Sequence, residues 1–210
     1  MFPMLAAAAA FTAPVPAMTN DWFSPVYDWP KTGIGPNELV VVEAEITVNR
    51  NGYMERCTGH VRSGNPQMGP YVCSRLKLRN VFEPARDPDG KRMFGVYRNF
   101  VVLFNGGRDS KEFPPYRATD FDIAAAAGKD AARRFFIQFA VDAQGRPSAC
   151  SLVKEAGFGL ARHAQVIDPA IVERACAEVA TRMRLEPARD RKGAAVASVQ
   201  NALVGIIEPK

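Results

Sequence analysis

The chain has 210 residues, of which 47% are hydrophobic and 23% are charged, and it carries a formal net charge of +5. This length suits one or two domains, and the composition is that of an ordinary soluble globular protein. Lysine and arginine are mixed with acidic residues throughout, which excludes the clustered positive surface that nucleic-acid binding requires.

The chain opens with a short apolar segment, residues 1–17, that has features of a secretion signal. Val15-Pro16-Ala17 has the small-residue shape of a signal-peptidase site, and the segment is too short to span a bilayer as a helix. We therefore predict an exported precursor, with residues 1–17 as its signal peptide and a true translation start upstream. The alternative is an unstructured Ala/Pro tail. No other stretch suits a transmembrane helix, so we expect no integral membrane anchor.

Alternating hydrophobicity predicts a β-hairpin after an irregular lead-in at residues 20–38. Every second residue from Val42 to Val48 is apolar, which is the period of a half-buried strand. Asn51-Gly52 is a strong hairpin-turn signal, so we expect the chain to return along residues 53–61. A short helix is predicted next, over about residues 67–80.

A motif that follows this helix occurs twice. Residues 82–90 read F-E-P-A-R-D-P-D-G and residues 185–193 read L-E-P-A-R-D-R-K-G, so six identities return 103 positions later. Such a match indicates a tandem duplication. In each motif we expect proline to end the helix and aspartate to hold a turn into a third strand. Acid–base chemistry by Arg86 and Asp87 is the alternative, but neither motif brings a nucleophile or a histidine with it.

Third strands are expected at residues 97–104 and 199–207, one after each motif. Between the copies, residues 105–119 are rich in glycine, proline and charge and are predicted to be a linker. A short helix is expected at residues 123–127, before the second copy proper.

The second copy repeats the order of elements. Phe135–Val141 alternates as a strand, Gln144-Gly145 makes the turn, and Asp168 caps a helix that has Pro169 at its first position. The predicted fold class is α+β, with two tandem β-β-α-β domains at residues 28–104 and 120–208. Each domain would be a small antiparallel sheet with one helix packed on it.

Four cysteines are divided evenly between the copies at equivalent positions. Cys57 and Cys73 are 16 residues apart, and Cys150 and Cys176 are 26 apart. One pair in each small exported domain predicts two structural disulfides. The alternative is buried free thiols in a cytosolic protein.

The remaining residues show no pattern typical of a catalytic or metal site. The two histidines, His60 and His163, do not have the spacing of metal ligands, and no phosphate-binding glycine loop is present. The second copy carries ten extra residues between its cysteines, in a loop that contains His163. We expect no cofactor and no enzymatic activity.

The order of these motifs resembles a tandem pair of TonB C-terminal domains, in particular the cysteine-containing periplasmic variety. The resemblance is carried by the lead-in Asp28-Trp29-Pro30, by the turns ending in glycine, and by Phe82-Glu83-Pro84-Ala85 before a hydrophobic strand. Asp120-Phe121 and Leu185-Glu186-Pro187-Ala188 are the counterparts in the second copy.

The resemblance implies a periplasmic, non-enzymatic protein-binding module, linked to TonB-dependent transmembrane transport. Its partners would be envelope proteins such as an outer-membrane receptor, held by strand addition at an open sheet edge. By this analogy the edge lies on the third strands, at Phe100, Val101, Val102, Leu203, Val204 and Ile206. The alternative is a structural or assembly protein of the envelope whose two copies pair with each other and close their edges.

Overall fold

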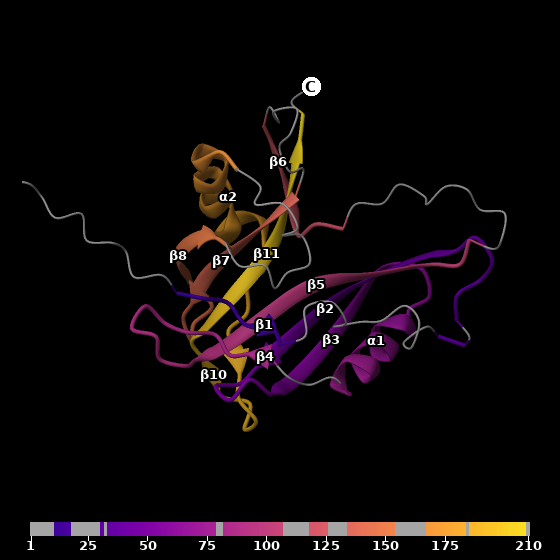
Figure 1. The fold of residues 1–210 in the computed structure, drawn as a ribbon, viewed down its shortest axis with the longest axis horizontal. Helices are drawn as coiled ribbons and strands as arrows, with labels where there is room; N and C mark the ends of the chain where they lie inside the picture. Colours follow the sequence, from indigo (N-terminus) through magenta and orange to yellow (C-terminus); the bar gives the residue numbers. More distant parts are fainter. Residues whose placement is uncertain are drawn as a thin grey trace, which may run out of the picture.

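The computed structural model describes residues 11–17, 30–31, 33–78, 82–106, 118–125, 134–153, 167–183 and 185–208. The first half contains β1 (Val15–Pro16), β2 (Leu39–Val48), β3 (Met54–Ser63), α1 (Met68–Lys77), β4 (Phe82–Glu83) and β5 (Phe94–Phe104). The second half contains β6 (Phe121–Ala124), β7 (Arg134–Val141), β8 (Pro147–Leu152), α2 (Pro169–Arg182), β9 (Ala188–Arg189), β10 (Ala195–Val196) and β11 (Ser198–Ile207). Figure 1 shows these elements on the ribbon.

Seven strands form one mixed sheet that runs through both halves. Its order is β3-β2-β5-β11-β7-β8, and β6 pairs with β11 outside this path. The expectation of two separate β-β-α-β domains, each with its own small antiparallel sheet, is therefore wrong. The two third strands, β5 and β11, pair in parallel at Phe94–Val96 and Ser198–Gln200 and so join what would otherwise be two sheets.

The sequence of β11 explains why it lies inside the sheet. All of its residues except the last are buried, so both of its faces are covered. A strand buried on both faces is typical of the centre of a sheet rather than its edge. Beyond the three paired residues β5 and β11 separate, and Figure 1 shows β5 running toward α1 while β11 runs toward β6.

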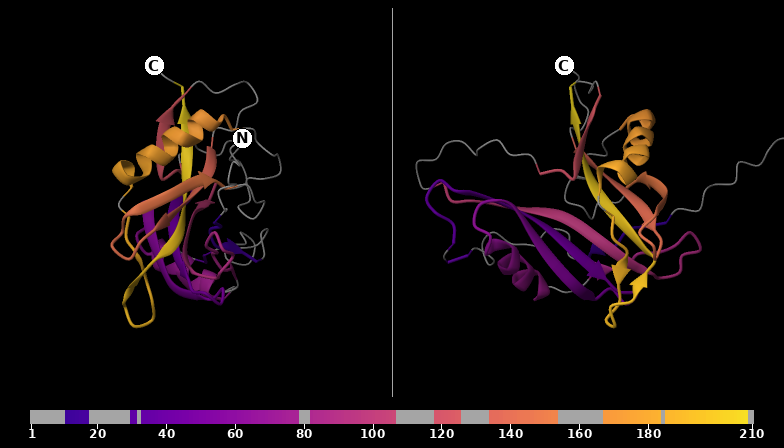
Figure 2. Two further views of the ribbon diagram at one scale, coloured as in Figure 1. Left: turned by 90° about the vertical axis from the view of Figure 1, so that its left-hand side faces the viewer. Right: turned by 180° about the vertical axis from the view of Figure 1, so that it is seen from behind.

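Each helix covers its own half of the sheet. Helix α1 packs on β2 and β3, and α2 packs on β7 and β8. The two helices lie far apart, as the view from behind in Figure 2 shows. The prediction for the second helix is confirmed in detail, because the Asp168 side chain accepts a hydrogen bond from the Ala170 N–H and Pro169 occupies the first turn.

The turns after the two E-P-A-R-D motifs also form as the aspartate pattern predicts. Asp87 accepts hydrogen bonds from the N–H groups of Asp89 and Lys91, and Asp190 does the same for Lys192 and Ala194. These are turns closed by an aspartate side chain bonding its own backbone. The motif is structural in both copies.

Two disulfides are present at the predicted positions. Cys57 bonds Cys73 and Cys150 bonds Cys176, and each tethers a strand to the helix of the same half. Such bonds form and persist in oxidising compartments, which favours a location outside the cytosol. In the part of the chain that the structure describes, no helix has the length and apolarity needed to cross a membrane.

The hydrophobic core is shared between the halves. One cluster lies under α1 and includes Phe136, Val199 and Leu203 from the second half, together with Phe11, Ala13 and Val15 from the N-terminal segment. A second cluster lies under α2 and contains second-half residues alone. Part of the predicted signal peptide is therefore packed into the first core; residues 1–10 lie outside the described residues.

Candidate functional site

The residues predicted to form a strand-addition edge fall on two strands with different surroundings. Phe100, Val101 and Val102 lie on β5, and Leu203, Val204 and Ile206 lie on β11. Val101 points into the core, where it is 4% exposed. Phe100 and Val102 are partly exposed and lie on the opposite face of the strand.

The three residues on β11 are not at an edge. Along one side β11 pairs with β7 from Ser198 to Gly205. On the other side it pairs first with β5 and then, over Val204–Ile207, in parallel with β6. The predicted helix at residues 123–127 is wrong at its start, because Ile123 and Ala124 belong to this added strand; residues 126–127 lie outside the described residues. The prediction of an edge on β11 has to be corrected for the same reason.

The outer side of β5 differs, because the pairing with β11 stops at Val96. Just beyond this point the Arg98 N–H donates to Asn201 Oδ1 at 2.7 Å, and Asn201 Nδ2 donates to the Arg98 carbonyl at 2.8 Å. The amide of one side chain thus satisfies the backbone where the two strands separate. Because backbone groups alternate along a strand, those of Phe100 and Val102 point to the same side as those of Arg98.

No strand among the described residues pairs with Phe100–Val102 on that side. We call these three residues the β5 open edge. The Phe100 N–H is held by Asn99 Oδ1 at 2.8 Å, a local bond that a partner strand could replace. By the 103-residue repeat, Val101 corresponds to Val204, which is where β6 adds to β11.

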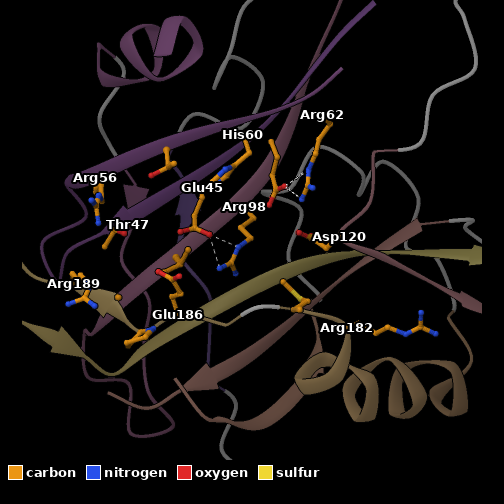
Figure 3. A pocket seen from close by; sticks show the side chains of 16 residues that line it. Glu45, Thr47, Arg56, His60, Arg62, Arg98, Asp120, Arg182, Glu186 and Arg189 are labelled. Carbon is orange, nitrogen blue, oxygen red and sulfur yellow. Dashed lines mark hydrogen bonds and ion pairs between the residues drawn. The ribbon is translucent and has the colours of Figure 1, made fainter. Parts of the chain in front are cut away.

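A polar cleft of about 490 Å³ lies on the face of the sheet opposite α1 (Figure 3). Its floor comes from the outward-facing residues of β2, β3 and β5, including Glu43, Glu45 and His60. Its other wall comes from the second half, through the end of α2 and the second E-P-A-R segment. The cleft is thus a feature of the joined halves, and neither half forms it alone.

A buried arginine connects the two walls. Arg98, 4% exposed, donates from Nε to Glu45 Oε2 at 2.9 Å and from a terminal nitrogen to Gln200 Oε1 at 2.9 Å. Gln200 in turn donates to the Glu186 carbonyl at 2.8 Å. Because a buried guanidinium needs its donors satisfied, this chain of contacts holds the second E-P-A-R segment against the first half.

The other charges in the cleft include a second ion pair and one perturbed carboxyl. Arg62 pairs with Glu43 across β2 and β3. Asp120, directly before β6, accepts the Leu203 N–H at 2.6 Å. Burial, and secondarily the nearby Glu43 carboxylate, raise the pKa of Asp120 to about 7, although its hydrogen bond from Leu203 and the two nearby arginines act in the opposite direction.

Several of the charged side chains in the cleft, which catalysis would require, are paired with one another. Arg98 and Arg62 each bind a glutamate, whereas Arg56 and His60 make no side-chain hydrogen bond or ion pair with any described residue. Within the described ranges no three His, Cys, Asp or Glu side chains gather as metal ligands. His163 lies outside them. The arrangement suits holding two halves together beside an accessible strand.

Comparison of the chain with protein-family models, with curated proteins and with solved structures found no match.

Proposed function

We propose that this protein is a periplasmic, non-enzymatic protein-binding module of the TonB C-terminal type. In this proposal an extended segment of an envelope protein, such as an outer-membrane receptor in TonB-dependent transport, adds as a strand to the β5 open edge. The observation that carries the proposal is the unpaired side of β5 at Phe100–Val102.

The physical reason is the free hydrogen-bonding capacity of such an edge. Backbone N–H and C=O groups left without a partner strand form a template for another chain, and main-chain pairing supplies affinity with limited sequence demand. The chain contains its own example of this mode, because β6 adds in parallel to β11 at the equivalent place in the second copy. The partly exposed side chains of Phe100 and Val102 would supply apolar contacts to the incoming strand.

Two further features support a periplasmic location. The paired cysteines need an oxidising environment to form disulfides. Residues 1–17 have the composition of an export signal with a cleavage site after Ala17. A non-enzymatic role is favoured because the buried charges of the cleft serve to bind the halves to each other.

A structural or assembly role in the envelope is the second candidate, and one observation favours it. The third strands of the two copies pair with each other, so part of the edge that a partner would use is already occupied within the chain. This pairing covers three residues, however, and leaves Phe100–Val102 outside it.

The first experiment is photo-crosslinking in cells with a benzoylphenylalanine at Phe100. Because this replaces one aromatic side chain by another at the open edge, it should capture an envelope protein that mass spectrometry identifies. The same crosslinker at Tyr53, an aromatic residue that is 53% exposed in a distant turn, is the matched control.

A second variant tests whether the backbone carries the binding. Val102→Pro removes an N–H that points to the open side and leaves the bonds to β2 in place, a substitution that edge strands tolerate. Crosslinking from Phe100 should then fall at least tenfold, with the disulfides and circular dichroism unchanged. If the crosslinkers at Phe100 and Tyr53 capture only the same chain or a second molecule of this protein, the structural role is favoured instead.

A further inference from the structure

The segment Phe11–Ala17 crosses the boundary between the two halves in an extended conformation (β1 in Figure 1). It pairs antiparallel with the first E-P-A-R motif: Val15 lies opposite Glu83, and Thr12 and Arg86 exchange backbone hydrogen bonds of 3.0 Å in both directions. The segment is therefore already bound by strand addition, on a different edge from that of β5.

One side chain of the second half forms hydrogen bonds with the backbone of the same segment. Gln138 of β7 accepts the Ala13 N–H at 2.8 Å and donates to the Phe11 carbonyl at 2.7 Å. An amide that bonds both polar groups of an extended backbone recognises conformation and makes no demand on side-chain identity. Gln138 itself is 8% exposed, so this contact is shielded from water.

Alternate side chains of the segment point into the shared core. Phe11, Ala13 and Val15 are 7%, 4% and 8% exposed and belong to the same cluster as Phe136 and Leu203. Pro14 and Pro16 are buried as well, so the segment is enclosed on both faces over residues 13–16. The pocket for Pro14 depends on a missing side chain, because a Cβ at Gly95 would lie 2.6 Å from the Pro14 ring.

We propose that the groove between the first E-P-A-R motif and Gln138 is a second peptide-binding site. In the full-length chain residues 11–17 fill it, and removal of the leader after Ala17 opens it to an extended, uncharged segment of a partner protein. That segment would carry an aromatic residue, a small residue and a β-branched residue at alternate positions.

The argument rests on what leader removal would leave behind. The groove is built from β4, β5 and β7, none of which belongs to the leader. Without Phe11–Val15, apolar side chains of the cluster that these residues share with the sheet would face water, which is unfavourable. An apolar groove with backbone-bonding groups along both walls is the type of surface that binds an extended peptide. The inference rests on the export step of the proposed function and is independent of the β5 open edge.

The test uses the full chain with a site-specific protease sequence inserted between Ala17 and Met18. The protein is folded, cut at this site and separated from the released leader. A fluorescently labelled peptide, Phe-Thr-Ala-Pro-Val-Pro-Ala, is then added and its anisotropy measured. We expect saturable binding to the cut protein and at least tenfold weaker binding to the uncut protein, whose own segment competes intramolecularly.

Two changes locate the binding. A peptide with aspartate in place of Ala13 should not bind, because a carboxylate would be buried without a partner. In the protein, Gln138→Ala should weaken binding about tenfold, since two hydrogen bonds are lost. Gln144→Ala, in an exposed turn of the same hairpin, is the control and should leave the affinity unchanged.

Three results would overturn the proposal. The first is no peptide binding to a cut protein whose circular dichroism is unchanged, and the second is equal binding of the aspartate peptide. If cutting unfolds the protein, excess peptide should restore the signal, and failure to restore it is the third. The mass of the exported protein checks the export step separately: a first residue of Met18 supports leader removal, whereas retention of Phe11 overturns the opening of the groove and leaves the Phe100 crosslinks unaffected.

Discussion

Asp120 is the residue whose ionisation is most closely tied to the fold. Its carboxylate caps the Leu203 N–H at the point where β6 begins, and it faces Glu43, Arg62 and Arg98 of the first half. Its pKa is raised from 3.8 to about 7, because burial disfavours the charged form. A carboxyl with a higher pKa in the folded state stabilises folding most below its unfolded pKa, and this contribution is lost as the pH rises through the folded pKa.

The stability of the protein should therefore fall between about pH 4, near the unfolded pKa, and about pH 7, near the folded pKa. Over this pH range the original protein should lose about 2 kcal/mol of unfolding free energy that the Asp120→Asn variant keeps. This is less than the full value that the pKa shift implies, because the side chain is partly exposed. Asparagine retains an oxygen for the Leu203 N–H but does not titrate. Urea unfolding of both proteins at several pH values measures this, and parallel pH profiles would contradict the assignment.

At the scale of elements, each disulfide fixes the second strand of its copy to the following helix. The first closes a separation of 16 residues and the second a separation of 26. In the loop-entropy account a crosslink stabilises mainly by restricting the unfolded chain, so the longer loop gives the larger effect. The ten residues that the second copy gained thus lie inside its disulfide loop.

Replacing Cys150 and Cys176 together by alanine should lower the free energy of unfolding by about 2–4 kcal/mol. Replacing Cys57 and Cys73 should cost about 0.4 kcal/mol less, from the ratio of the loop lengths. Chemical unfolding of the two double variants under identical conditions provides the comparison. A clearly larger cost of replacing Cys57 and Cys73 would show that packing under α1, rather than loop length, dominates.

At the scale of the whole molecule, contacts between the copies are of several kinds. The sheet is continuous through β5 and β11, the core under α1 contains second-half side chains, and Arg191 of the second half pairs with Glu55 of the first at 2.8 Å. Arg98 and Asn201, which are equivalent positions 103 residues apart, bond each other at the boundary. The duplicated halves are therefore mutually dependent parts of one structure.

Leu203→Ala tests this dependence, because Leu203 is 4% exposed and packs in the core of the other half. We expect a loss of about 2–4 kcal/mol and one cooperative unfolding transition. Hydrogen exchange should show amides of β2 and β11 losing protection together. Loss of protection in β11 alone would indicate two independently folding domains.

The amino-acid sequence by itself determined the local structure of this protein. Asp168 and Pro169 start a helix, Asp87 and Asp190 close their turns, and the spacing of the cysteines predicts both disulfides, because caps, turns and short loops depend on residues close in sequence. The repeat also located equivalent elements in both halves.

Only the tertiary structure decided which strands are neighbours. The alternation of apolar residues in a strand indicates which face is buried, but it does not indicate which other strand pairs along each edge. The junction of β5 with β11 therefore could not be predicted. The alanine-rich composition near residue 123 favours a helix, but pairing with β11 places Ile123 and Ala124 in a strand. For the same reason, no local pattern contains the role of Gln138, which binds a residue 127 positions away, or the raised pKa of Asp120, which is caused by burial and by the distant Glu43.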